Sequence, residues 1–129
     1  MTTQTQYWVV GSTLIGASAK KTFVDRGYWQ LGTNSKVRAD TLYMERFNQI
    51  RVGDRIALKS LAGKGTALIK IHAIGIVKDV AVDERRVYID WVRTELNRHL
   101  ALNGCMDAIS TPYDLGGKDK DWINDMFRI

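Results

Sequence analysis

The residues that most often carry catalysis are few in this sequence and stand apart from one another. His72 and His99 each lack a second histidine, cysteine or carboxylate at the spacing of a metal site. No histidine is placed by the sequence to activate the thiol of Cys105. The segment Gly63–Thr66 resembles a phosphate-binding loop but lacks the glycine that belongs five residues before Lys64. These patterns favour a binding protein over an enzyme, and they predict neither a metal nor a cofactor.

Aromatic residues are the second group whose types and spacing indicate chemistry. Tyr28 and Trp29 stand between two glycines where we expect a loop, which is a poor place for a tryptophan that serves packing alone. Trp8 and Trp91 lie in expected strands, where each can either fill a core or border a pocket. Trp122 lies in an expected terminal helix and is assigned a structural role. Trp29 is therefore the strongest candidate for contact with a ligand.

Four segments rich in apolar and β-branched residues predict the strands that position these side chains: Tyr7–Val10, Arg55–Ser60, Thr66–Val80 and Arg86–Val92. In the second of them, apolar and polar residues alternate as in a half-buried strand. Gly75 interrupts the third and predicts a bulge that lets the sheet curl. We expect loops at Gly11–Ala19 and at Leu61–Gly65.

Helices are expected between and after these strands. A short one at Lys20–Arg26 ends at a glycine, and a second one at Thr41–Gln49 is capped by Asp40. Thr94–Asn103 permits a helix, and Lys118–Arg128 has the apolar spacing of one. The order of strand, helices, three consecutive antiparallel strands and helical tail predicts an α+β fold. We expect a small curled β-sheet or open β-barrel decorated with helices.

Composition narrows the class of protein. The chain has 129 residues, of which 45% are apolar and 26% charged, and this excludes intrinsic disorder. Its single cysteine excludes a disulfide scaffold, and no apolar run reaches the roughly 20 residues of a membrane span. Residues 1–5 are polar and are expected to be flexible, whereas residues 6–129 read as one domain. We therefore expect a cytoplasmic domain, and the net charge of +5 is compatible with nucleic acid.

Four motifs in order resemble one family. They are YWVVG at Tyr7–Gly11, GYWQLG at Gly27–Gly32, IRVGDRIALKS at Ile50–Ser60, and AIGIVKD followed by VYIDW between Ala73 and Trp91. Their order and spacing resemble the EVE-type branch of the PUA-like superfamily, which is related to the YTH domain. The resemblance is greatest to the modules that accompany modification-dependent restriction systems. It covers about two thirds of the chain, from Tyr7 to Trp91.

The resemblance implies a curled sheet that reads a modified base in DNA by flipping it into an aromatic pocket, as the recognition module of a restriction or defence system. Carried over by motif, Trp29 matches the pocket tryptophan of the family and Ser60 its pocket serine. The remaining residues assigned to this pocket are Trp8, Tyr28, Leu61 and Trp91. Stacking on aromatic walls would offset the cost of extruding the base.

Basic residues occur on both sides of this pocket in the sequence and predict contacts with the nucleic-acid backbone: Lys20, Lys21, Lys36, Arg38, Lys59 and Lys64. Two alternatives remain open. The domain reads RNA as PUA-like and YTH relatives do, or it is an interaction module that recruits a nuclease or ATPase partner. A nuclease or ATPase, in the same chain or a separate one, is also the partner that the resemblance implies for the leading hypothesis.

Overall fold

The computed structural model describes residues 4–14, 16–62 and 67–129. Within them the elements follow one another as β1 (Tyr7–Gly11), β2 (Thr13–Leu14), β3 (Ala17–Ser18), α1 (Lys20–Arg26), β4 (Tyr28–Gln30), α2 (Val37–Phe47), β5 (Arg55–Leu61), β6 (Leu68–Ala81), a 3-10 turn (Val82–Glu84), β7 (Arg86–Arg93), β8 (Arg98–Ala101) and α3 (Lys120–Phe127). Lys64, the Gly63–Thr66 segment and part of the expected flexible start lie outside the described residues. No helix in the described ranges has the length and apolar character to cross a membrane.

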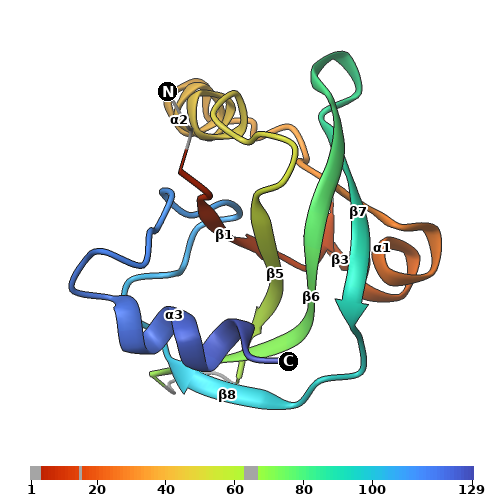
Figure 1. Cartoon of the computed structure of the whole chain (residues 1–129). Coiled ribbons are helices and arrows are strands. Elements are labelled where there is room, and N and C mark those ends of the chain that lie inside the picture. The colour runs from red at the N-terminus through yellow and green to blue at the C-terminus, as the bar shows by residue number, and fades with distance from the viewer. Residues whose placement is uncertain (1–3, 15, 63–66) are drawn as a thin grey trace.

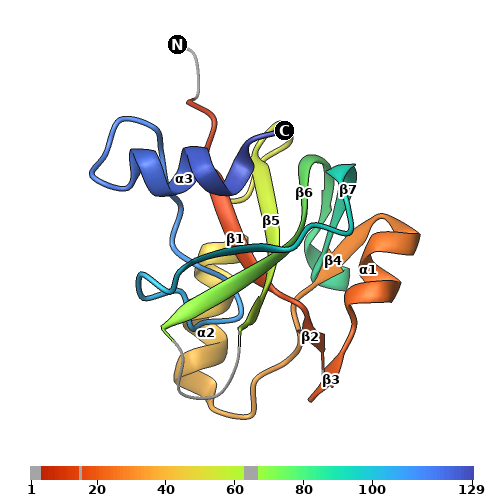
Figure 2. The ribbon, with the colours of Figure 1, turned by 90° about the horizontal axis from the view of Figure 1, so that it is seen from below.

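The fold is α+β and is built on one strongly curled, open sheet, as the sequence predicted (Figure 1). Strands β5, β6 and β7 are consecutive and antiparallel, while β1 pairs with β5 in parallel. The order along the sheet is β1-β5-β6-β7-β4, and β8 pairs with the first part of β6. The second view shows α3 lying across β1 on one side of the sheet and α2 on the other (Figure 2). A small separate hairpin, β2–β3, occupies the segment that was expected to be a loop.

The free edge of β1 is covered by a segment from the last quarter of the chain. Tyr113 and Ile109 form isolated bridges with Tyr7 and Val10. The hydroxyl of Ser110 accepts a hydrogen bond of 3.0 Å from the backbone N–H of Val9. These contacts complete the hydrogen bonding of β1 without adding a full strand.

Both faces of the central strands are buried, which the alternating pattern did not predict for β5. One core holds Ile56 and Leu58 of β5 with Trp8, Phe23 and Phe47. The other core holds Ala57 with residues of β1, β6 and α3: Val9, Ile69, Ile71, Ile74 and Met126. The expectation of a half-buried strand was wrong because α3 and the segment before it cover the face that was assigned to solvent.

Local signals account for two of the helices. Helix α1 ends at Gly27, whose positive φ of 71° lets its N–H reach the carbonyl of Phe23. Helix α3 turns Ile123 and Met126 inward, as predicted. Helix α2 begins at Val37, four residues earlier than expected, so Asp40 lies inside its first turn and is not its cap.

The carboxylate of Asp40 instead accepts two hydrogen bonds from the guanidinium of Arg85, at 2.8 and 2.9 Å, and one from the backbone N–H of Asn34. The bond from Arg85, followed by that from Asn34, lowers the pKa of Asp40 to about 2. The residue therefore ties the start of α2 to the turn between β6 and β7.

Two further expectations were wrong. Tyr28 and Trp29 form the edge strand β4, which pairs with β7, and are not in a loop. Thr94–Asn103 contains strand β8 and no helix: Glu95 has a positive φ of 56°, which ends any helical turn there. Residues 98–101 then pair with the first part of β6, whose edge would otherwise be free.

Two irregularities bend the long strand β6. The pairing of β6 with β7 shifts between Ile74 and Gly75, which confirms the predicted bulge. The pairing of β5 with β6 shifts between Leu58 and Lys59, so that His72 on β6 has no residue directly opposite. This second bulge positions the candidate site described next.

Candidate functional site

The structure does not bring the tryptophans of the expected aromatic pocket to one cavity. Trp8 is fully buried, and its indole N–H donates a hydrogen bond of 2.9 Å to the carboxylate of Asp54. Trp29 is 1% exposed and stacks on Phe47 with ring centroids 6.3 Å apart. Both side chains belong to the core, where they pack in one cluster with Phe47 of α2.

Trp91 and Tyr28 are half-buried beside α1, at the opposite edge of the sheet from β1. The indole N–H of Trp91 donates to the carbonyl of Phe23 at 2.9 Å. Tyr28 packs edge-on against Phe23 and Tyr88, and the guanidinium of Arg86 lies 4.4 Å from its ring centroid. The ring and N–H groups of this cluster are therefore occupied by neighbours within the protein.

Three of the predicted site residues do meet in one cleft, at the end of β5. Lys59, Ser60 and Leu61 line it from β5. The turn after β1 and the segment before Ile109 supply the other walls: Gly11, Ser12, Thr13, Met106, Asp107 and Ala108. Its volume of about 370 Å³ falls in the range of small-molecule sites. We refer to it as the Lys59 cleft.

Backbone hydrogen bonds hold the walls of the Lys59 cleft together. Gly11 donates its N–H to the carbonyl of Ala108 at 2.8 Å, and Ser12 donates to the carbonyl of Lys59 at 2.9 Å. The indole N–H of Trp29 donates to the carbonyl of Gly11 at 2.9 Å. Trp29 thus supports the cleft through its hydrogen bond to Gly11, and it is not one of the residues that line the cleft.

Lys59 is one of the residues that line the cleft, and it is only 4% exposed. Burial lowers the pKa of Lys59 below its ordinary value, while Cys105 and Asp107 act in the opposite direction. Burial also raises the pKa of the Cys105 thiol, which lies 3.3 Å from the hydroxyl of Tyr113. The neighbouring thiol therefore stays neutral near pH 7.

Ser60 is oriented by a histidine that the sequence left without a partner. Its hydroxyl oxygen lies 2.7 Å from Nε2 of His72, the residue displaced by the bulge in β6. Burial, followed by the charges of Lys20 and Lys70, lowers the pKa of His72 to about 4. A neutral imidazole of such low basicity is a weak general base, so the pair presents a fixed hydroxyl and not an activated nucleophile.

The lining of the cleft also includes exposed apolar side chains. Leu61 and Met106 line it, and they are 51% and 65% exposed. Asp107 lies beside them, and its carboxylate accepts hydrogen bonds from Arg46 at 2.8 Å and from the hydroxyl of Tyr43 at 3.3 Å. The lining of the cleft therefore combines apolar side chains with charged and hydroxyl-bearing ones, a composition that suits a flat ligand with a polar edge.

The predicted backbone-binding cations are distributed over several elements. Lys20 lies near His72, whereas Lys21 is exposed and pairs with Asp25 at 2.6 Å. Lys36 and Arg38 are exposed at the start of α2. Arg46 of the same helix contacts Asp107 in the lining of the cleft. Arg38 lies eight residues before it, about 12 Å away along the helix axis.

Lys70 is a basic residue that sequence reasoning missed. It lies directly opposite Ser60 in the β5–β6 pairing. The bulge at Leu58 and Lys59 sets this register, and no local pattern in the sequence fixes which residues a bulge brings into register. Lys20 and Lys70 are therefore the cations that the described residues place beside the Ser60–His72 pair.

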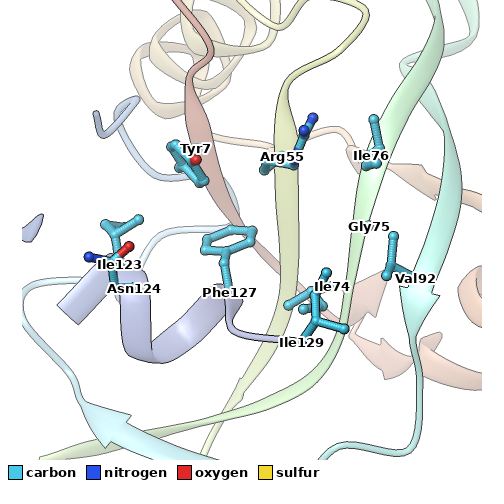
Figure 3. Close-up of a pocket in the computed structure, with 10 residues that line it drawn as sticks. All are labelled: Tyr7, Arg55, Ile74, Gly75, Ile76, Val92, Ile123, Asn124, Phe127 and Ile129. Carbon is cyan, nitrogen blue, oxygen red and sulfur yellow. The ribbon is translucent and has the colours of Figure 1, made fainter. Parts of the chain in front are cut away.

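A second pocket of about 230 Å³ lies between the sheet and the end of α3 (Figure 3). Phe127 and Ile129 face Ile74 and Val92 across it. The guanidinium of Arg55, at its rim, donates to the carbonyl of Gly53. Because this pocket is mainly apolar, it offers fewer groups for recognising a polar edge than the Lys59 cleft.

Among residues 4–14, 16–62 and 67–129, no group of three or more His, Cys, Asp or Glu side chains is arranged to hold a metal ion. Comparison with protein-family models, with curated proteins and with solved structures finds no match to this chain.

Proposed function

We propose that this chain is a nucleic-acid-binding domain that receives an unpaired or extruded base in the Lys59 cleft. The observation that carries the proposal is that exposed apolar side chains, Leu61 and Met106, line the same cleft as the polar residues Lys59 and Ser60. A nucleobase has apolar faces and a hydrogen-bonding edge, so both kinds of side chain have a counterpart on it.

An EVE-type fold of the PUA-like superfamily is part of the same proposal. It is supported by the curled sheet and by the order of its strands, with β1 parallel to β5 and the antiparallel series β5–β6–β7. It is also supported by Ser60, the pocket serine of the resemblance, which lines the cleft. In this reading the domain recognises a modified base in DNA on behalf of a restriction or defence system.

The walls of the cleft set an expectation for affinity. Extruding a base from a duplex costs a few kcal/mol, and aromatic stacking of about 1–3 kcal/mol per base usually offsets it. Leu61 and Met106 provide apolar contact without such stacking, although the thioether of methionine adapts well to flat surfaces. We therefore expect tighter binding to a base that is unpaired or weakly paired than to one in a stable duplex.

The test uses fluorescence anisotropy of labelled oligonucleotides: duplexes with a modified cytosine or adenine, the unmodified duplexes, and single-stranded DNA and RNA of the same sequence. Ser60→Ala should weaken binding of the preferred probe by about fivefold, because one hydrogen bond to the base is lost. Ser35→Ala removes an exposed hydroxyl before α2 and is the matched control.

Equal, weak binding of every probe by the wild-type chain and by Ser60→Ala would refute the proposal. Tighter binding to the RNA strand than to the DNA strand would assign the cleft to RNA, because only contact with the 2′-hydroxyl separates the two.

A further inference from the structure

Lys59 is a buried cation without a partner among the described residues. It is 4% exposed, and its ammonium group makes no hydrogen bond or ion pair with them within the usual distances. Removing a charge from water without compensation costs several kcal/mol, and buried lysines are therefore paired in most proteins. Because Lys59 lines an open cleft, the compensating group can come from a ligand.

The charged groups around Lys59 leave this part of the cleft positive. Asp107 is the acidic residue in the lining, and it is already engaged by Arg46 and by Tyr43. Cys105 is neutral, since burial raises its pKa. Lys59 and Arg46 thus contribute two positive charges against one negative charge.

We infer that the Lys59 cleft binds its ligand through an anionic oxygen group, a carboxylate or a phosphate, held by the ammonium of Lys59. The hydroxyls of Ser12 and Ser60, which line the same cleft, supply further donors. This inference rests on the proposed function where the group is an acidic substituent on an extruded base or a phosphate of the strand. The anion chemistry itself does not depend on nucleic acid.

The first experiment titrates the chain with inorganic phosphate and, separately, with acetate, and follows backbone amide resonances by NMR. We expect saturable shifts at Ser12 and Ser60. Lys59→Met should weaken this binding at least tenfold, because methionine keeps much of the length and loses the charge. Lys78→Met, which removes an exposed lysine on β6, should leave it unchanged.

Methionine is tolerated at a buried site, so Lys59→Met is expected to fold, and a wild-type thermal transition confirms it. Lys59→Arg keeps the charge and should retain part of the anion binding. Equal phosphate and acetate affinities for Lys59→Met and the wild type would overturn the inference. Shifts confined to exposed lysines would overturn it as well.

The second experiment identifies the source of the anion. Oligonucleotides carry a carboxylated cytosine, a methylated cytosine, plain cytosine or an added terminal phosphate. A preference of about tenfold for the carboxylated base, abolished by Lys59→Met, places the group on the base, and a preference for the terminal phosphate places it on the strand. Anion binding without nucleic-acid binding would refute the proposed function alone, and nucleic-acid binding without any dependence on Lys59 would refute this inference alone.

Discussion

Lys59 and His72 lie close together on neighbouring strands, and burial disfavours the charged form of both. The pKa of each is lowered, and desolvation is the first cause in both. His72 loses its charge and gains a hydrogen-bonding partner in Ser60. The ammonium of Lys59 has no hydrogen-bonding partner among the described residues, and Lys59 lines an open cleft. The imidazole of His72 thus serves as a structural hydrogen-bonding group, whereas the ammonium of Lys59 remains available to a ligand.

The depressed pKa of His72 makes stability sensitive to acid. An unfolded histidine titrates near pH 6.5, whereas the folded value is about 4, so the unfolded chain binds more protons between these values. The stabilisation is fully present above pH 6.5 and is lost as the pH falls towards 4. We expect the free energy of unfolding to fall by roughly 2 kcal/mol as the pH decreases from 6.5 to 4, because the unfolded chain takes up a proton at His72.

Urea denaturation at a series of pH values measures this effect. His72→Gln keeps an amide that can bond to Ser60 but does not titrate, so its stability should fall less between pH 6.5 and pH 4 than that of the wild type. The exposed His99 provides the control, and His99→Gln should retain the wild-type slope. An unchanged slope in His72→Gln would contradict the assignment.

Each tryptophan donates its indole N–H to a protein acceptor: Asp54 for Trp8, Gly11 for Trp29, Phe23 for Trp91 and Ala101 for Trp122. The sequence does not reveal such partners, since all of them are distant in the chain. The flanking glycines alone therefore made Trp29 the strongest candidate for contact with a ligand. Ser60 was assigned through the family resemblance, and it lies with Lys59 in the lining of the cleft.

At the scale of the elements, β6 organises the sheet. This 14-residue strand pairs with β5, β7 and β8, and its bulges direct its two halves towards different partners. Gly75 is the residue at which it approaches β7 most closely. A Cβ atom there would lie 2.5 Å from Cγ2 of Ile89 and 2.6 Å from the carbonyl oxygen of Asp90.

Gly75→Ala should therefore destabilise the fold by about 3 kcal/mol, because the backbone of β7 must move to admit the methyl group. Gly11→Ala is the matched control. A Cβ at Gly11 would have its nearest contact, with Ala108, at 3.7 Å, which is an ordinary distance. We expect a cost below about 1 kcal/mol for that variant. Thermal unfolding of both variants measures these costs. A large cost for Gly75→Ala alone indicates the close approach of β7, whereas equal costs would indicate that neither glycine of the sheet can be replaced by alanine.

The elements divide clearly into those that local patterns predict and those that they do not. Helices α1 and α3 and strands β1, β6 and β7 have strong apolar periodicity or clear end signals, and they were predicted within a few residues. Strands β4 and β8 are short and depend on a neighbour for their existence. Their sequences suit several local structures, and the pairing partner decides among them.

At the scale of the whole molecule, the net charge of +5 includes few described cations near the Lys59 cleft. Besides Lys59 itself and Arg46, which is engaged by Asp107, these are Lys20 and Lys70, beside the Ser60–His72 pair. We therefore expect contact with few phosphates. For about three such contacts, the logarithm of the binding constant should fall with the logarithm of salt concentration with a slope of about −2 to −3.

Lys70→Gln should reduce the magnitude of this slope by about one, because one phosphate contact is removed. Lys78 lies on the same strand, eight residues away or about 26 Å along it, and pairs with Asp90. Lys78→Gln should leave the slope unchanged. Anisotropy titrations at four or more salt concentrations measure both, and equal slopes for the two variants would remove Lys70 from the interface.

The covering of β1 by the segment around Ser110 has a consequence for biosynthesis. The two residues joined by the hydrogen bond from Val9 to Ser110 are 101 positions apart. A ribosome therefore releases β1 long before it releases the segment that closes its edge. During that interval the first strand exposes unpaired backbone groups, a known route to aggregation. This domain should therefore acquire its native structure late in synthesis, and a slowly translated or stalled chain should depend on chaperones.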